Sequence, residues 1–123
     1  MEFKDAIDAH VNWKVRLRLL MAGQEKIDAN VASKDNECAL GKWIYGEGSR
    51  ALAKDPEVLD GLRKAHAAFH QIAGTAIRAI QSGDLARAEA MLEADGEISE
   101  RSFDVVSRIR KIQALLGQAS STR

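Results

Sequence analysis

The spacing of the apolar residues is the feature that most limits how this chain can fold. Over residues 3–27, 59–80 and 88–116 they recur at steps of three and four, which places them on one face of an α-helix. The chain has a single proline, and its abundant alanine and leucine favour helices over strands. We therefore predict an all-α fold of amphipathic helices around one core.

Start and stop signals divide the chain into three long helices and one short helix. The predicted helices cover about residues 2–30, 38–45, 56–82 and 85–116. Asp55 followed by Pro56 is a strong start for the third of them, because Asp caps a helix and Pro suits its first position. For the short helix we expect Asp35 or Asn36 to be the N-cap.

Short connections between these helices predict an antiparallel bundle. Two arrangements fit the pattern. Either three long helices form the core and short helices complete its fourth side, or residues 47–54 add an element and produce a four-helix bundle. We expect one domain over residues 1–117, followed by a frayed tail over residues 118–123.

Composition excludes several functional classes. Lys+Arg and Asp+Glu both total 18, so the chain lacks the basic charge that nucleic-acid binding requires. No apolar run approaches the roughly 20 residues of a membrane helix, and the first residues do not resemble a signal peptide. One cysteine cannot form a disulfide within the chain and is typical of the cytosol. We expect a cytoplasmic protein that neither binds nucleic acid nor inserts into a membrane.

The three histidines and the single cysteine form a candidate metal site. His66 and His70 are four positions apart, so they lie on one face of the predicted helix, one turn apart. His10 lies on the apolar face of the first helix, and Cys38 begins the short helix. Three imidazoles and one thiolate suit tetrahedral Zn²⁺. Because these four donors fill the coordination sphere, the site would be structural or sensory, and we expect no enzymatic activity.

The residues alone leave other interpretations open. A histidine on an apolar face is often a hydrogen-bonded core residue, and a buried cysteine often acts as a small apolar side chain. A helical bundle without metal therefore remains an alternative. A di-iron site is disfavoured, because Arg63 and Ala67 stand where a Glu-x-x-His motif needs glutamate. No acid lies between His66 and His70, which disfavours a metalloprotease.

Three short motifs resemble the bacterial chemoreceptor zinc-binding (CZB) domain family. They are His10-x-x-Trp13, Cys38-x-Leu40-Gly41-x-Trp43 and His66-x-x-x-His70, with 28 positions from the first to the second (38 − 10) and 28 more to the third (66 − 38). The resemblance implies an antiparallel four-helix bundle with a short extra helix carrying the cysteine. It also implies that the motif histidines and cysteine bind zinc, while Trp13, Gly41 and Trp43 pack around them.

Function follows from the same resemblance. Members of the family are commonly attached to chemoreceptor signalling domains or to diguanylate cyclases, and some are homodimers. The resemblance therefore implies a sensory or regulatory domain that responds to zinc availability or to oxidation of Cys38 and controls a chemotaxis or cyclic-di-GMP output. The alternative is a structural zinc bundle that serves as a dimerisation or interaction module without switching. The chain shows no signalling or cyclase domain of its own.

The chemistry of the donor set gives three further expectations. Zinc needs a thiolate and neutral imidazoles, so its affinity should fall as the pH falls through the histidine range. Cys38 should be the movable ligand, because it lies on a short element between loops, and its thiolate is the oxidisable form. The polar residues Asp95, Ser99 and Ser102 either accept a hydrogen bond from a ligating imidazole or face solvent or a partner subunit.

Overall fold

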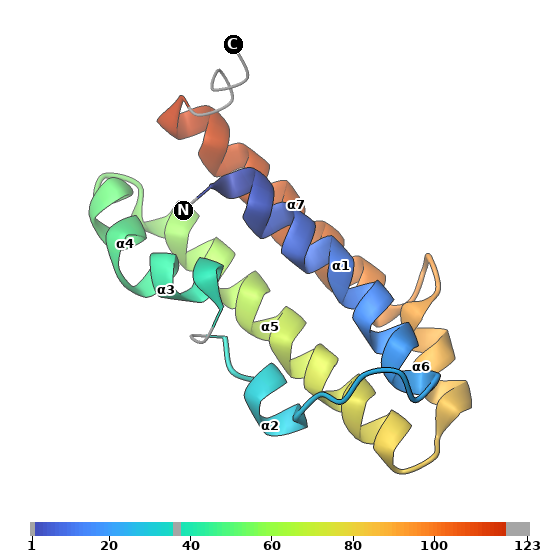
Figure 1. The fold of residues 1–123 in the computed structure, drawn as a ribbon. Helices are drawn as coiled ribbons and strands as arrows, with labels where there is room; N and C mark the ends of the chain where they lie inside the picture. The colour runs from blue at the N-terminus through green and yellow to red at the C-terminus, as the bar shows by residue number, and fades with distance from the viewer. Residues whose placement is uncertain (1, 36–37, 118–123) are drawn as a thin grey trace.

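A computed structural model describes residues 2–35 and 38–117, and within these ranges the chain is helical without a strand (Figure 1). Its helices are α1 (Phe3–Met21), α2 (Ala29–Ala32), α3 (Ala39–Tyr45), α4 (Glu47–Ala51), α5 (Pro56–Gln81), α6 (Leu85–Leu92) and α7 (Glu97–Leu116). The prediction of an all-α bundle is confirmed. In the part of the chain described, no helix is both long enough and apolar enough to cross a membrane.

Three long helices form the frame of the bundle. Helix α7 packs against both α1 and α5 and runs antiparallel to them, while α6 connects α5 to α7 (Figure 1). The short helices α2, α3 and α4 all pack against α5. Residues 47–51 form the additional element considered in the second expected arrangement, but the described residues contain three long helices, so an antiparallel bundle of four long helices is not confirmed.

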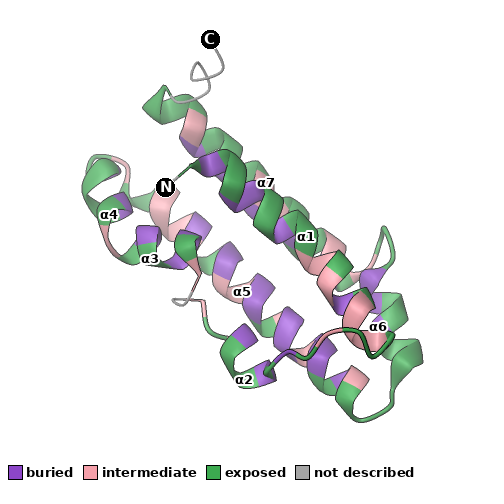
Figure 2. Ribbon diagram, viewed as in Figure 1, coloured by how far each residue is buried: buried purple, intermediate pink, exposed green. Residues whose placement is uncertain are grey.

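The apolar faces of the long helices meet in one core. Buried positions follow one side of α1, α5 and α7 (Figure 2). The side chains with no exposed surface include Leu17, Leu62, Phe69, Ile77, Ile98 and Ile109. Burial of a side chain of this size stabilises a fold by roughly 1.5–3 kcal/mol, so the stripes seen in the sequence supply the main driving force for folding.

The first helix ends nine residues earlier than the expected position, at Met21 rather than Asn30. Gly23 has a φ of +74°, a left-handed conformation that ends helices and that glycine adopts without strain. The N–H of Gln24 then donates to the carbonyl oxygen of Leu19 at 2.8 Å, which closes the helix end. The released segment leads to α2, whose N-cap Asp28 accepts a hydrogen bond from the N–H of Asn30 at 2.8 Å.

The last predicted helix is in fact two helices, because α6 ends at Leu92 and α7 begins at Glu97. A Cβ at Gly96 would collide with the carbonyl oxygens of Ala90 and Met91. Only glycine permits so tight a turn between the two helices. The apolar stripe continues across the break, which is why the sequence pattern predicted one helix.

The helix starts were predicted with mixed success. Asp55 and Pro56 take their expected positions, although no side-chain capping bond forms at Asp55 among the described residues. The N-cap of α3 is Cys38 itself and not Asp35, whose carboxylate instead accepts a hydrogen bond from the Tyr45 hydroxyl at 2.6 Å. Asn36, the other expected cap, and the predicted tail over 118–123 lie outside the described residues.

Candidate metal centre

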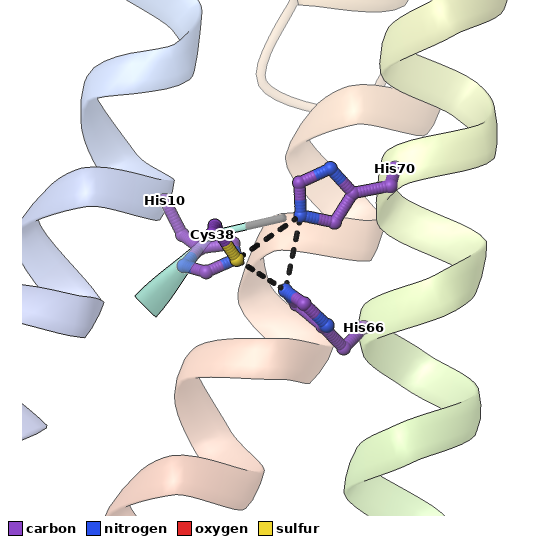
Figure 3. Close-up of side chains that lie close together, drawn as sticks. All are labelled: His10, Cys38, His66 and His70. Atoms are coloured by element: carbon purple, nitrogen blue, oxygen red, sulfur yellow. Dashed lines mark hydrogen bonds between the residues drawn. The ribbon is translucent and has the colours of Figure 1, made fainter. Parts of the chain in front are cut away.

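Four side chains from separate parts of the chain converge between α1, α5 and the start of α3 (Figure 3). They are the predicted His10, Cys38, His66 and His70, and one ligand atom from each lies within 4.8 Å of all the others. The histidines are buried, with exposed fractions of 3%, 0% and 3%, while Cys38 is half-buried. The structure thus assembles the complete donor set predicted from the sequence.

The distances within this cluster fit a tetrahedral ion. The Cys38 Sγ lies 3.2 Å from the Nε2 of His66 and 3.7 Å from the Nε2 of His70, and the two imidazole nitrogens are 3.0 Å apart (Figure 3). Around zinc, with bonds of about 2.0 Å to nitrogen and about 2.3 Å to sulfur, neighbouring ligand atoms lie roughly 3.3–3.6 Å apart. These three side chains therefore need only small adjustments to hold the ion, and the ligand atom of His10 lies within 4.8 Å of each of them.

Two of the imidazoles are oriented by backbone carbonyls. The Nδ1–H of His10 donates to the carbonyl oxygen of Ala6 at 2.8 Å, and the Nδ1–H of His70 donates to that of Ala32 at 2.8 Å. These bonds leave each Nε2 as the atom with a free lone pair. The Nε2 of His10 is buried and has no hydrogen-bond partner among the described residues, which is the environment of a metal ligand.

The polar residues considered for this orienting role do not perform it. Asp95 is exposed in the turn between α6 and α7, and the Ser99 hydroxyl donates to the carbonyl oxygen of Glu93 at 2.6 Å. Ser102 is buried on α7, but no described imidazole bonds to it. Among the described residues, the Nδ1 of His66 has no hydrogen-bond partner, so no carbonyl or side chain orients this imidazole from the Nδ1 side.

Aromatic side chains surround the cluster. The Phe69 ring, absent from the predicted site, lies 5.1 Å from the ring of His10, and the Trp13 ring lies 6.3 Å from that of His70. Trp43, a residue of α3, instead packs edge-on against Phe3 in the core, with 5.1 Å between the ring centroids. In the sequence, Phe69 could have been identified by its position between His66 and His70 on the apolar face of α5.

Gly41 contributes its backbone to the cluster. It lies buried in the first turn of α3, and its N–H donates to the Cys38 Sγ at 3.4 Å. This bond stabilises a negatively charged sulfur, as helix N-termini do for anions.

Burial sets the protonation of the cluster in the absence of metal. It lowers the pKa of His10 to about 4 and that of His66 to about 2, with a smaller contribution from the neighbouring histidines. Burial also lowers the pKa of His70, although the hydrogen bond to the Ala32 carbonyl partly opposes this shift. For Cys38 burial raises the thiol pKa, and the N–H of Gly41 only partly offsets it. At neutral pH the imidazoles are therefore ready to bind a cation, and only the cysteine must lose a proton.

A helical bundle with a closed set of nitrogen and sulfur donors is a small metal-binding domain. The family model of the chemoreceptor zinc-binding domain matches residues 10–77, more than half of the chain. The chain belongs to this family and is a zinc-binding domain. Separate comparisons with curated proteins and with solved structures found no match.

The contact between α2 and α5 yields a prediction about this site. A Cβ at Gly74 would lie 2.8 Å from the Cβ of Ser33, so Gly74→Ala should displace α2 and with it the Ala32 carbonyl that orients His70. We expect a loss of zinc affinity of about tenfold, as for other groups that orient ligands. Competition with a chromophoric chelator measures it.

The matched control is Gly61→Ala on the same helix. An added Cβ there meets only the flexible guanidinium end of Arg108, and the gain in helix propensity is the same. Equal zinc affinities for the two variants would contradict the predicted role of α2.

Proposed function

We propose that His10, Cys38, His66 and His70 are the ligands of one zinc ion and that the chain is a zinc-dependent sensory domain, not an enzyme. The observation that carries this proposal is the convergence of four donors, three of them buried, on one point. A site whose four positions are all filled by protein leaves none for a substrate or a reactive water.

The four donors differ in how firmly the fold holds them. The histidines lie within α1 and α5, helices of 19 and 26 residues that pack in the core. Cys38 is the half-buried N-cap of α3, a helix of seven residues. Zinc, when bound, supplies a positive charge that keeps Cys38 deprotonated and joins α3 to α5. Cys38 is therefore the ligand whose loss costs the rest of the fold least.

Two events would release this link. One is depletion of zinc. The other is oxidation, in which the Cys38 sulfur attacks a peroxide oxygen, the O–O bond breaks, hydroxide or alkoxide leaves, and a sulfenic acid forms. In either case α3 loses its attachment to the cluster and becomes free to move, which is a recognised form of switching.

The family supports a signalling context for this switch. The proposed setting is the cytoplasm, the proposed assembly is a homodimer, and the proposed target is a chemoreceptor or diguanylate cyclase output. The competing proposal is a structural zinc bundle that supports association without switching.

Hydrogen exchange with and without zinc separates the two proposals. We expect amide protection over residues 38–45 to fall on zinc removal, while the centre of α7 keeps its protection because its side chains pack in the core. The same loss should follow treatment of the zinc-loaded chain with peroxide. Equal protection over 38–45 in all three samples would favour the structural module.

A further inference from the structure

Two separate openings reach Cys38, and they share no other residue of the part of the chain that the structure describes. The first, which we call the basic pocket, has a volume of about 320 Å³, and its lining includes Trp13, Arg16, Lys26, Lys34, Cys38 and His70. The second, which we call the acidic pocket, has a volume of about 270 Å³, and its lining includes Glu2, Asp5, His10, Cys38 and Leu40.

The basic pocket carries three cationic side chains against one acid, Asp28. Arg16 is partly neutralised, because it forms an ion pair with Glu25 at 2.9 Å and lies over the Trp13 ring at 4.4 Å. The exposed Lys26 and Lys34 form no ion pair within the described residues, so their charge remains at the opening. A small anion entering here meets positive charge before it meets the sulfur.

The acidic pocket has the opposite character. Of the described residues that line it, Glu2 and Asp5 are acidic and none is cationic. At its inner end lie Cys38 and the imidazole of His10, whose buried Nε2 has no hydrogen-bond partner among the described residues. A cation entering here meets two carboxylates and then two of the four donors.

We propose that these openings divide access to the site by charge: small thiol-reactive anions reach Cys38 through the basic pocket, and the metal cation passes through the acidic pocket. The physical basis is that a cleft lined by one sign of charge concentrates ions of the opposite sign and speeds their arrival. This inference rests on the proposed function in taking Cys38 as the reactive group and the four residues as the zinc ligands.

Three methanethiosulfonates test the basic pocket on the full, zinc-loaded chain. One carries a sulfonate, one a trimethylammonium group, and the third is the neutral methyl compound. In each case the Cys38 sulfur attacks the sulfenyl sulfur, a disulfide bond forms, the bond to the sulfonyl sulfur breaks, and methanesulfinate leaves. Dividing the reaction rate of each charged reagent by that of the neutral reagent corrects for any change in the intrinsic reactivity of the thiolate.

We expect the sulfonate reagent to react faster than the trimethylammonium reagent relative to the neutral compound. Lys26→Gln combined with Lys34→Gln should lower the sulfonate ratio by about tenfold at low ionic strength, and concentrated salt should shrink this difference. The control is Lys54→Gln combined with Lys111→Gln, which removes the same charge from exposed positions outside both pockets and should leave the ratio unchanged. Equal ratios for the two double variants would overturn the basic-pocket assignment.

Stopped-flow zinc uptake by the metal-free full chain tests the acidic pocket. Glu2→Gln combined with Asp5→Asn should slow association by about tenfold at low ionic strength and leave the sulfonate ratio unchanged. The control is Glu93→Gln combined with Asp95→Asn, two exposed acids in the turn between α6 and α7, which should leave the rate unchanged. Equal slowing by both pairs would overturn the acidic-pocket assignment.

These results separate this inference from the sensory proposal. If α3 loses amide protection without zinc but the reagents show no charge preference, the sensory proposal stands and only the proposal of charge-selective access is contradicted. If access is charge-selective but the amide protection of α3 never changes, the proposal of charge-selective access stands and the sensory proposal is contradicted.

Discussion

His66→Ala should lower the zinc affinity of this chain by about two to three orders of magnitude. Structural zinc sites are worth roughly 10–16 kcal/mol, so one ligand of four accounts for about 3 kcal/mol or more. His66 is the most buried of the three imidazoles, and its Nε2 lies near both Cys38 and His70. Competition with a chromophoric chelator gives the affinity, and elemental analysis should find about one zinc per chain before the substitution and far less after it.

The control for this prediction is Gln71→Ala, an exposed position on the same helix. It should bind zinc as the unchanged chain does. Circular dichroism of both metal-free variants shows whether α5 remains folded, so that a lost ligand can be told from a lost helix. An affinity within threefold of the original in a folded His66→Ala chain would rule out His66 as a ligand.

The donor set was predictable because regular geometry links its members. Helical spacing places His66 and His70 on one face whatever the rest of the fold does. The apolar stripe of α1 directs His10 inward, since residues on that stripe must face the core. Cys38 had no such constraint, and its position followed from the motif it shares with the family.

The orientation of the imidazoles was not predictable. It depends on the backbone carbonyls of Ala6 and Ala32, and every residue of the chain has a carbonyl, so no side-chain pattern marks these two. The Ala32 bond also requires α2 to lie against α5, a contact between segments 38 positions apart. Asp95, Ser99 and Ser102 were candidates because their side chains can form hydrogen bonds, whereas a sequence does not show where a backbone carbonyl will lie.

The helix breaks were missed for a similar reason. Gly23 and Gly96 were visible, but glycine occurs in helices as well as at their ends. At Gly96 the decisive fact is the closeness of the Ala90 carbonyl, a contact that exists only once α6 and α7 have packed. The charged openings were equally hidden, because Lys26 comes to line the same pocket as Cys38 only when α2 packs against α5.

Zinc affinity should rise by about tenfold for each pH unit near neutral pH, and by no more than about a hundredfold for each unit near pH 5. The metal-free imidazoles of His10 and His66 are already neutral over pH 5 to 8, because burial lowers the pKa of His10 to about 4 and that of His66 to about 2. Burial also lowers the pKa of His70, so this imidazole is neutral at pH 7 and above. Burial raises the pKa of Cys38, so its thiol must release one proton for each zinc bound. A lower pH keeps the thiol protonated and therefore weakens binding.

The slope distinguishes this account from the expectation based on ordinary histidines. With three imidazoles titrating near their usual pKa of about 6.5, the slope would approach four below pH 6, because four protons would then leave with each ion. Calorimetry in buffers of different ionisation enthalpy counts these protons directly, with circular dichroism to confirm that the chain stays folded at each pH. In Cys38→Ala the remaining imidazoles release no proton at pH 7 and above, so the weaker zinc affinity of this variant should stay nearly constant from pH 7 to pH 8. A slope well above one near neutral pH, or above two near pH 5, in the unchanged chain would mean that the buried histidines are protonated before zinc arrives, and burial would then not have prepared the site.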